Sequence, residues 1–325
     1  MEQDIGILRE DTNQIKGIAI LLVLLGHSRM WFQISNIVPD RMTTAGAWGV
    51  AIFLTLSGYG LTESFLKKGL SISFVKRRVT KVILPYAAVS TLWFIVDFIA
   101  LHQTTSIKNV ITTLLGVLLY EPYLDPTMWY ITFMLFWYVV FFIIFLLPIH
   151  KGLKVAILFL IAFLLQHNTI NLNSNWEYNY FTFPMGVLVS YQKQIIFNRN
   201  SRIILNNIAI FVLFIISPYI IEFSNYTEIS IAGICVTLWV ITLISMIDYK
   251  SKILGFLGYV SFEIYLLEGI IGGKYREIIG LGVSIRAFIA YLFITICLAY
   301  VFKKLQIFIG KISKKIIYEK ANFVA

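Results

Sequence analysis

The chain has 325 residues, of which 58% are apolar or aromatic and only 14% are charged. Soluble domains are about 45–50% apolar and about 25% charged. A soluble core of this size cannot bury so much apolar surface, and the same composition excludes a disordered chain. The chain also carries a formal net charge of +10, and in a membrane protein the positions of such charges indicate the orientation.

The apolar residues gather in runs of roughly 15–22 residues, which are long enough to cross a bilayer as helices. None shows the alternating pattern of a membrane β-barrel. The runs predict an all-α, polytopic integral membrane protein with about ten transmembrane helices, at residues 15–35, 47–66, 82–102, 128–148, 153–167, 181–196, 203–221, 229–247, 252–271 and 283–302. The weaker segment 107–120 predicts an interfacial or re-entrant piece.

The first run, Ile15 to Phe32, is followed by no small-residue cleavage site, which predicts a retained helix and not a signal peptide. No Pro- or Ser-rich linker, soluble domain or internal repeat interrupts the chain, so we expect residues 1–325 to form a single membrane-embedded domain. Cys235 and Cys297 lie far apart within apolar runs, which favours buried thiols over a disulfide or a metal cluster.

The positive charges are distributed unevenly between the two sides of the predicted bundle. With the N-terminus inside, 21 of the 27 Lys and Arg fall in cytoplasmic segments, which leaves six for the outer segments. This bias predicts a multi-pass plasma-membrane protein with both termini in the cytoplasm. Most of the +10 charge therefore encodes orientation, and it is no evidence for nucleic-acid binding.

His27 lies inside the first apolar run, where a titratable side chain is costly and is a candidate for function. Lys16 precedes it by eleven residues, or three helical turns plus roughly 20°, so the two share one helix face about 16 Å apart. A long anionic cofactor could place its charged end near Lys16 and its reactive end near His27. The alternative is a packing histidine bonded to a neighbouring carbonyl.

Glu263 lies eleven residues after Lys252 in the ninth run, at a depth similar to that of His27. A carboxylate at that depth needs a partner, and His27 is one candidate, because such a contact would orient the ring and raise its basicity. The alternative is a structural hydrogen bond to a tyrosine, a serine or a backbone group.

A basic segment, SFVKRRVTKVILPY, follows the second run and contains Arg77, Arg78 and Lys81. Arginine offers a bidentate fork for phosphate, so the segment is a candidate anion-binding site. The alternative is a topology signal or contact with anionic lipid headgroups.

Three further residues are candidates for binding a substrate. Glu268 lies at the outer end of the ninth run and could face an outer vestibule. Trp129 starts the fourth run, where an aromatic ring beside carboxylates suits sugar binding, although an aromatic belt at the membrane interface is the commoner meaning. Tyr59 follows Gly58 in TLSGYG, where small residues would allow another helix to approach closely.

Four segments together resemble the membrane acyltransferase-3 family: NQIKGIAILLVLLGHS, WGVAIFLTLSGYGL, FVKRRVTKVILPY and LGYVSFEIYLL. With about ten spans, the resemblance covers essentially the whole chain, and the first and third segments are its specific ones. Members of this family use cytoplasmic acyl-CoA to acylate an acceptor handled at the outer side, usually a sugar hydroxyl of a surface glycan.

The resemblance implies roles for individual residues. The family's arginine, followed eleven residues later by a histidine, falls on Lys16 and His27, and its basic pair falls on Arg77 and Arg78. Lysine at position 16 keeps the charge but loses the planar fork. Ala51 stands where many members have an acidic residue, and Glu268 where the ninth-span motif often ends in histidine. These two changes concern the acceptor more than the reaction class.

We therefore expect an O-acetyltransferase that moves an acetyl group from cytoplasmic acetyl-CoA to a hydroxyl of a cell-surface polysaccharide or another envelope glycan. His27 is the expected catalytic base with Glu263 beside it, while Lys16, Arg77, Arg78 and Lys81 are expected to bind acetyl-CoA. The expected partners are acyl-CoA, a glycan or lipid-linked sugar, and membrane lipids, with no metal and no nucleic acid. Direct transfer and a transient acyl-imidazole both fit.

Two other functions also fit the sequence. One is a transporter of a polysaccharide or a lipid-linked sugar, although transporters often show repeated halves and paired broken helices, which are not seen here. The other is a non-catalytic assembly partner with the same fold. Succinyl or another acyl group in place of acetyl also agrees with these residues.

Overall fold

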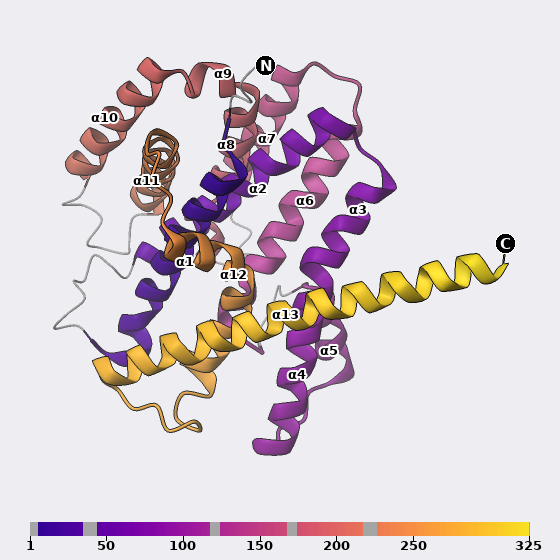
Figure 1. Ribbon diagram of the computed structural model, residues 1–325. Helices are drawn as coiled ribbons and strands as arrows, with labels where there is room; N and C mark the ends of the chain where they lie inside the picture. The colour runs from indigo at the N-terminus through magenta and orange to yellow at the C-terminus, as the bar shows by residue number, and fades with distance from the viewer. Residues whose placement is uncertain (1–5, 35–43, 118–123, 168–173, 217–225, 325) are drawn as a thin grey trace.

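The computed structural model describes residues 6–34, 44–117, 124–167, 174–216 and 226–324. Helices joined by turns make up this part of the chain, with no β-strand among the described residues, which confirms the predicted all-α class. In chain order they are α1 (Arg9–Phe32), α2 (Ala45–Lys68), α3 (Ile72–Arg78), η2 (Val79–Ile83), α4 (Leu84–Ala100), α5 (Ile107–Leu114), η3 (Pro126–Met128), α6 (Trp129–Leu146), α7 (Lys151–His167), η4 (Ser174–Trp176), α8 (Thr182–Tyr191), α9 (Lys193–Ile196), α10 (Arg199–Ile216), α11 (Tyr226–Met246), α12 (Lys252–Gly269), η6 (Ile270–Lys274) and α13 (Ile285–Val324). Figure 1 shows that the long α13 extends past α4 toward the C-terminus.

Within the described ranges, 7 helices are long and apolar enough to cross a membrane, namely Arg9–Phe32, Ala45–Lys68, Ile72–Ala100, Pro126–Leu146, Tyr226–Met246, Lys252–Lys274 and Ile285–Ile312. Each coincides with one of the predicted spans. The other predicted spans, at 153–167, 181–196 and 203–221, fall on α7, on α8 with α9, and on α10, which do not reach the same length and hydropathy. The predicted count of about ten is therefore not confirmed. The segment 107–120 contains the short α5, which packs against α4.

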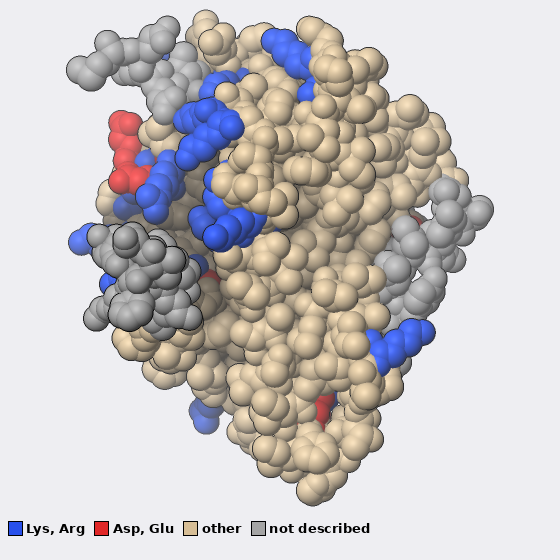
Figure 2. Space-filling model, turned by 90° about the vertical axis from the view of Figure 1, so that its right-hand side faces the viewer, with Lys and Arg blue, Asp and Glu red and all other residues tan. Residues whose placement is uncertain are grey.

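The outward faces of these helices are apolar. Phe98, Phe214 and Phe293 are 63%, 77% and 70% exposed, and many Ile and Leu side chains accompany them. Water would not tolerate so large an apolar surface, whereas lipid favours it. Figure 2 shows a wide band without charged residues on one face, while most of its Lys and Arg gather in the upper part. The chain is therefore a multi-pass membrane protein.

The helix α1 packs against α2, α11 and α12. Its contact with α12 is close because glycine faces backbone there: a Cβ on Gly17 would lie 2.2 Å from the carbonyl oxygen of Leu254. Gln14 sets the register, since its side chain donates to the Ser251 carbonyl (3.0 Å) and accepts from the Ser251 amide (3.1 Å). The helices therefore run in parallel, with the middle of α1 level with the middle of α12.

The two cysteines are both free thiols. Cys235 of α11 is half-buried, but Cys297 of α13 is exposed. The prediction of two buried thiols is therefore wrong for Cys297, because that face of α13 points away from the other helices.

Candidate active site

Two cavities between the described helices contain residues that were predicted to form the site. The smaller measures about 130 Å³ and contains His27, so we call it the histidine cavity. The larger measures about 680 Å³, and we call it the basic cavity because four cations line it: Lys16, Arg78, Lys81 and Lys303. Tyr130 of α6 and Tyr265 of α12 line both cavities. Lys16 lines the basic cavity and His27 lines the histidine cavity, so the two residues lie on either side of the same tyrosine pair.

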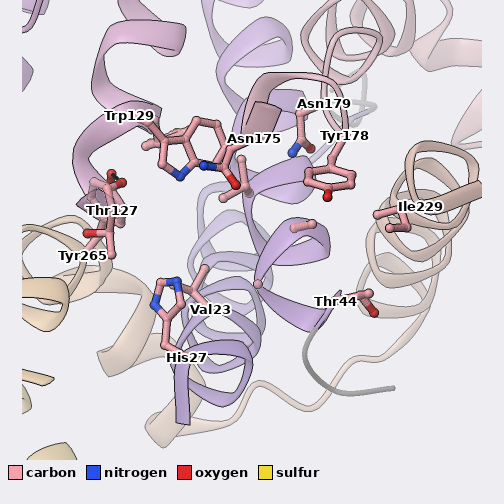
Figure 3. A pocket seen from close by; sticks show the side chains of 14 residues that line it. Val23, His27, Thr44, Thr127, Trp129, Asn175, Tyr178, Asn179, Ile229 and Tyr265 are labelled. Carbon is pink, nitrogen blue, oxygen red and sulfur yellow. Dashed lines mark hydrogen bonds between the residues drawn. The ribbon is translucent and has the colours of Figure 1, made fainter. Parts of the chain in front are cut away.

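The imidazole of His27 is held on two sides. Its Nδ1 lies 3.0 Å from Oε2 of Glu268, and its ring packs against Trp31 with centroids 4.6 Å apart. The side chain is 24% exposed, and Figure 3 shows it pointing from α1 into the cavity, below Thr127 and Trp129. The Glu268 carboxylate accepts a hydrogen bond from Nδ1–H of His27, so Nε2 is left as a proton acceptor that faces the cavity.

Glu268 lies at the end of α12, just before the π-helical segment η6, and it is fully buried. Its Oε2 also accepts a hydrogen bond from the Tyr291 hydroxyl of α13 (3.1 Å), while Oε1 has no hydrogen-bond partner among the described residues. Glu268 does not line the cavity itself. The residue that was predicted to contact a substrate therefore contacts the histidine.

The structure does not pair His27 with Glu263. Oε1 of Glu263 instead accepts from Nζ of Lys303 on α13 at 2.8 Å. Glu263 and Glu268 are five residues apart, which turns them by about 140° around the helix. Glu263 consequently faces the basic cavity, and Glu268 faces α1.

Four cations line the basic cavity against one carboxylate, Glu263. This excess of positive charge suits a large anion. The guanidinium of Arg78 lies over the rings of Phe74 and Tyr138, at 5.4 and 5.6 Å from their centroids, which orients its plane. Arg77 does not line the cavity and donates to the Ser73 hydroxyl at 3.1 Å. Of the predicted basic pair, only Arg78 therefore faces the site.

Lys303 and Gln306 of α13 line the basic cavity and were not among the predicted site residues. Lys303 belongs to a basic C-terminal group that has the ordinary composition of a topology signal, so nothing in its local sequence distinguishes it. The π-helical segment η2, which follows Arg78 and contains Lys81, is another feature of this wall. Such segments are rare and occur frequently at functional sites.

The walls of the histidine cavity include aromatic and amide side chains. Trp129, which was predicted to bind a substrate, lines this cavity, and Tyr178 and Asn179 line it on the other side (Figure 3). Asn175 also lines the cavity, and the sequence analysis singled out none of these last three residues. Tyr59 lies outside both cavities, where its hydroxyl accepts a hydrogen bond from the Ile7 amide at 3.0 Å.

Asp125 adds a second buried carboxylate near this site. Its Oδ1 accepts from the backbone amide and the hydroxyl of Thr127, both at 2.8 Å, and its Oδ2 has no hydrogen-bond partner in the described chain. Burial raises the pKa of the Asp125 carboxyl to about 6, against the opposing effect of the Thr127 amide, and the nearby charge of Glu268 adds to the increase. Gly269 makes this approach possible, because a Cβ there would lie 2.7 Å from both carboxylate oxygens.

A comparison with known proteins identifies the family of the chain. A family model described as an acyltransferase domain matches residues 10–304, a segment that contains His27, Glu268 and the four cations of the basic cavity. A search of curated proteins and a search of solved structures each found no match. Because the matched segment spans most of the 325 residues, the chain belongs to the acyltransferase-3 family, whose members carry out acyl transfer.

Proposed function

We propose that this protein is an integral-membrane O-acetyltransferase, which moves an acetyl group from acetyl-CoA to a hydroxyl of a cell-surface polysaccharide or another envelope glycan. One observation carries the proposal: four cations gather in one cavity, a histidine held by a buried carboxylate stands in the other, and the two cavities share a pair of tyrosines. An anionic acyl donor and a neutral hydroxyl acceptor need separate sites of this kind, with a base where they meet.

The donor occupies the basic cavity. Its volume of about 680 Å³ lies in the usual range of roughly 300–1,000 Å³ for small-molecule pockets. The phosphates of coenzyme A suit the fork of Arg78, and the ammonium groups of Lys16 and Lys303 act as point charges. The thioester arm of the donor is uncharged, and it extends from these cations toward the tyrosine pair.

The acceptor occupies the histidine cavity. Trp129 and Tyr178 offer aromatic faces to a sugar ring, and Asn175 and Asn179 offer amides that both donate and accept hydrogen bonds. His27 is the group that receives the proton of the attacking hydroxyl.

The transfer step balances with these groups alone. Nε2 of His27 takes the proton from the acceptor hydroxyl, whose oxygen forms a bond to the thioester carbonyl carbon. The carbon–sulfur bond then breaks, and the thiolate of coenzyme A receives the proton from the imidazolium. Glu268 stabilises the imidazolium while it exists. A positioned general base typically increases the rate of such a step by about 10²–10⁴-fold.

We place the basic cavity on the cytoplasmic side, where acyl-CoA is made. The segment 67–81 beside it carries six Lys and Arg, and such an excess is typical of cytoplasmic segments. The histidine cavity then faces the outer side, where a surface glycan is handled.

The test combines transfer and binding measurements on the purified protein in lipid nanodiscs. Acetyl-CoA labelled in the acetyl group is supplied with surface glycan from the producing cells. We expect His27→Ala to lose transfer while it still binds coenzyme A, and His150→Ala, an exposed histidine outside both cavities, to retain both. Full transfer by a correctly inserted His27→Ala protein would contradict the proposal.

Measurements in cells distinguish this proposal from the two alternatives, a transporter and a non-catalytic assembly partner. Mass analysis of the surface polymers, with and without this protein, should show an acetyl ester that disappears in the His27→Ala strain. A transporter would change the amount of exported glycan and leave its acetylation per residue unaltered. A non-catalytic assembly partner would tolerate the His27 replacement altogether.

A further inference from the structure

The two cavities meet at Tyr130 and Tyr265, the residues that line both. Their rings contact each other edge to face, with centroids 5.2 Å apart, and only 6% and 5% of the two residues is exposed. Edge-to-face contact is a favourable arrangement for two aromatic rings, so the pair closes the boundary by a defined contact.

The two tyrosines are held differently. The Tyr265 hydroxyl donates to the Thr127 carbonyl at 2.5 Å, and Thr127 is in turn bonded to Asp125. Tyr265 is therefore tied to the wall of the histidine cavity. The Tyr130 hydroxyl instead lies within hydrogen-bonding reach of the Ser57 hydroxyl, a side chain that lines the basic cavity. The Ser57 hydroxyl can turn about its Cα–Cβ bond and follow a movement of the Tyr130 ring. The Thr127 carbonyl is part of the backbone and cannot follow Tyr265 in this way.

The proposed reaction places demands on this boundary. The anionic end of the donor belongs with the cations of the basic cavity, while its acyl carbon must reach the hydroxyl that His27 activates. Among the described residues, Tyr130 and Tyr265 are the two that line both cavities and so lie between these positions. The acyl group therefore has to pass between the two rings, or displace one of them.

We infer that Tyr130 and Tyr265 select the acyl group by size and admit a short one such as acetyl. This inference rests on the proposed function. The histidine cavity, at about 130 Å³, has about one fifth the volume of the basic cavity, at about 680 Å³, so a long chain has no room beyond the pair. Each further methylene in a close-fitting apolar passage typically changes the relative rate about 10-fold or more. Tyr130 is the ring that moves, and Tyr265 is the fixed side of the passage.

The test is an acyl-length profile, measured as kcat/KM for acetyl-, propionyl- and butyryl-CoA with one glycan acceptor. The wild type should prefer acetyl-CoA over butyryl-CoA by at least about 100-fold. Tyr130→Ala should reduce this ratio by about 10-fold or more, and Tyr130→Phe should keep it, because the ring remains. Tyr249→Ala is the matched control, since this tyrosine is 80% exposed and lines neither cavity, and its ratio should equal that of the wild type.

Loss of the ring should also admit water to the thioester. We expect Tyr130→Ala to hydrolyse acetyl-CoA without acceptor faster than the wild type does. If Tyr130→Ala does not insert stably, Tyr130→Leu replaces the ring with a smaller apolar side chain and should shift the ratio in the same direction. An unchanged acetyl-to-butyryl ratio, in a variant that still transfers acetyl, would overturn the inference alone. No transfer from any coenzyme A thioester by the wild type would overturn the proposed function with it.

Discussion

His27 and Glu268 form a hydrogen-bonded pair across the contact between α1 and the end of α12, with Nδ1 3.0 Å from Oε2. The carboxylate is fully buried and also accepts from Tyr291, so its position is fixed from two directions. A carboxylate in this place sets the tautomer of the ring and stabilises its protonated form. In the proposed reaction, Glu268 therefore acts through His27.

Glu268→Gln should lower kcat for acyl transfer by about 10-fold or more and change KM less, because a neutral amide stabilises the imidazolium poorly. His27→Ala should lower kcat by about 10²–10⁴-fold. The double variant should be no slower than His27→Ala alone, since residues that act as one unit are not additive. Initial rates with saturating acetyl-CoA measure all three variants.

Glu277→Gln is the matched control for this series, because the Glu277 side chain is 85% exposed and its one ion pair among the described residues is with its neighbour Arg276 at 3.2 Å. Its rate should equal that of the wild type. If Glu268→Gln slowed the His27→Ala protein by a further factor, Glu268 would have a role apart from the histidine, and its assignment as a positioning residue would be wrong.

Arg78→Ala should raise KM for acetyl-CoA by about 10-fold or more and leave kcat at saturation nearly unchanged. Arg78 lines the basic cavity, and a hydrogen bond to a charged group contributes about 1.5–3 kcal/mol. Arg77→Ala should change KM much less, because Arg77 lies outside this lining and bonds to Ser73. Titration calorimetry with coenzyme A measures the same contrast without catalysis.

The contrast between these adjacent arginines tests the cavity itself. Both variants remove one positive charge from the same segment, so a general electrostatic attraction would weaken binding equally in both. Equal effects of Arg77→Ala and Arg78→Ala on coenzyme A binding would show that the donor does not occupy the basic cavity.

The depth of the candidate site along the helices could be predicted from the sequence. Which side chains of α12 point toward α1 could not. Helical rise alone placed His27 and Glu263 at one level, and the register set by Gln14 and Ser251 agrees with that level. Which carboxylate of α12 turns toward α1 depends on how α13 covers the other face. Lys303 pairs with Glu263 there across 40 positions of sequence, a contact that no local pattern encodes.

The contact between Tyr130 and Tyr265, where the two cavities meet, could not be predicted from the sequence either. Tyr130 lies in a run that is apolar all round, WYITFMLFWYVVFFIIFL, where one tyrosine resembles the other aromatic residues. Its role arises from contact with Tyr265 of α12, and such contacts follow from packing between distant helices. The helical class was predictable because apolar runs of this length have few other structures open to them in lipid.

Gly258→Ala should destabilise the folded protein by about 1–3 kcal/mol, the usual cost of overpacking. A Cβ at this position would lie 1.8 Å from the carbonyl oxygen of Asn13, and a backbone atom cannot move aside as a flexible side chain can. Gly60→Ala is the control, because nothing lies within 4 Å of its added Cβ and alanine favours a helix. Thermal denaturation in detergent measures both. Equal melting temperatures for the two variants would contradict the close packing of α1 on α12.

Asp125→Asn should stabilise the protein above about pH 6 and have little effect near pH 4. Burial raises the pKa of the Asp125 carboxyl to about 6, above the ordinary value of about 3.9, so the folded state holds this proton more tightly than the unfolded state. The stability of the wild type consequently falls as the pH rises through this window, by up to about 3 kcal/mol from this group. Asparagine cannot ionise, and its side-chain oxygen can still accept from the Thr127 amide. Thermal denaturation between pH 4 and 8 should show the difference between variant and wild type growing to about pH 6 and then levelling off, whereas the exposed Asp248, changed to Asn, should give a curve parallel to the wild type. A parallel curve for Asp125→Asn would mean that this carboxylate is ionised in the folded protein without cost.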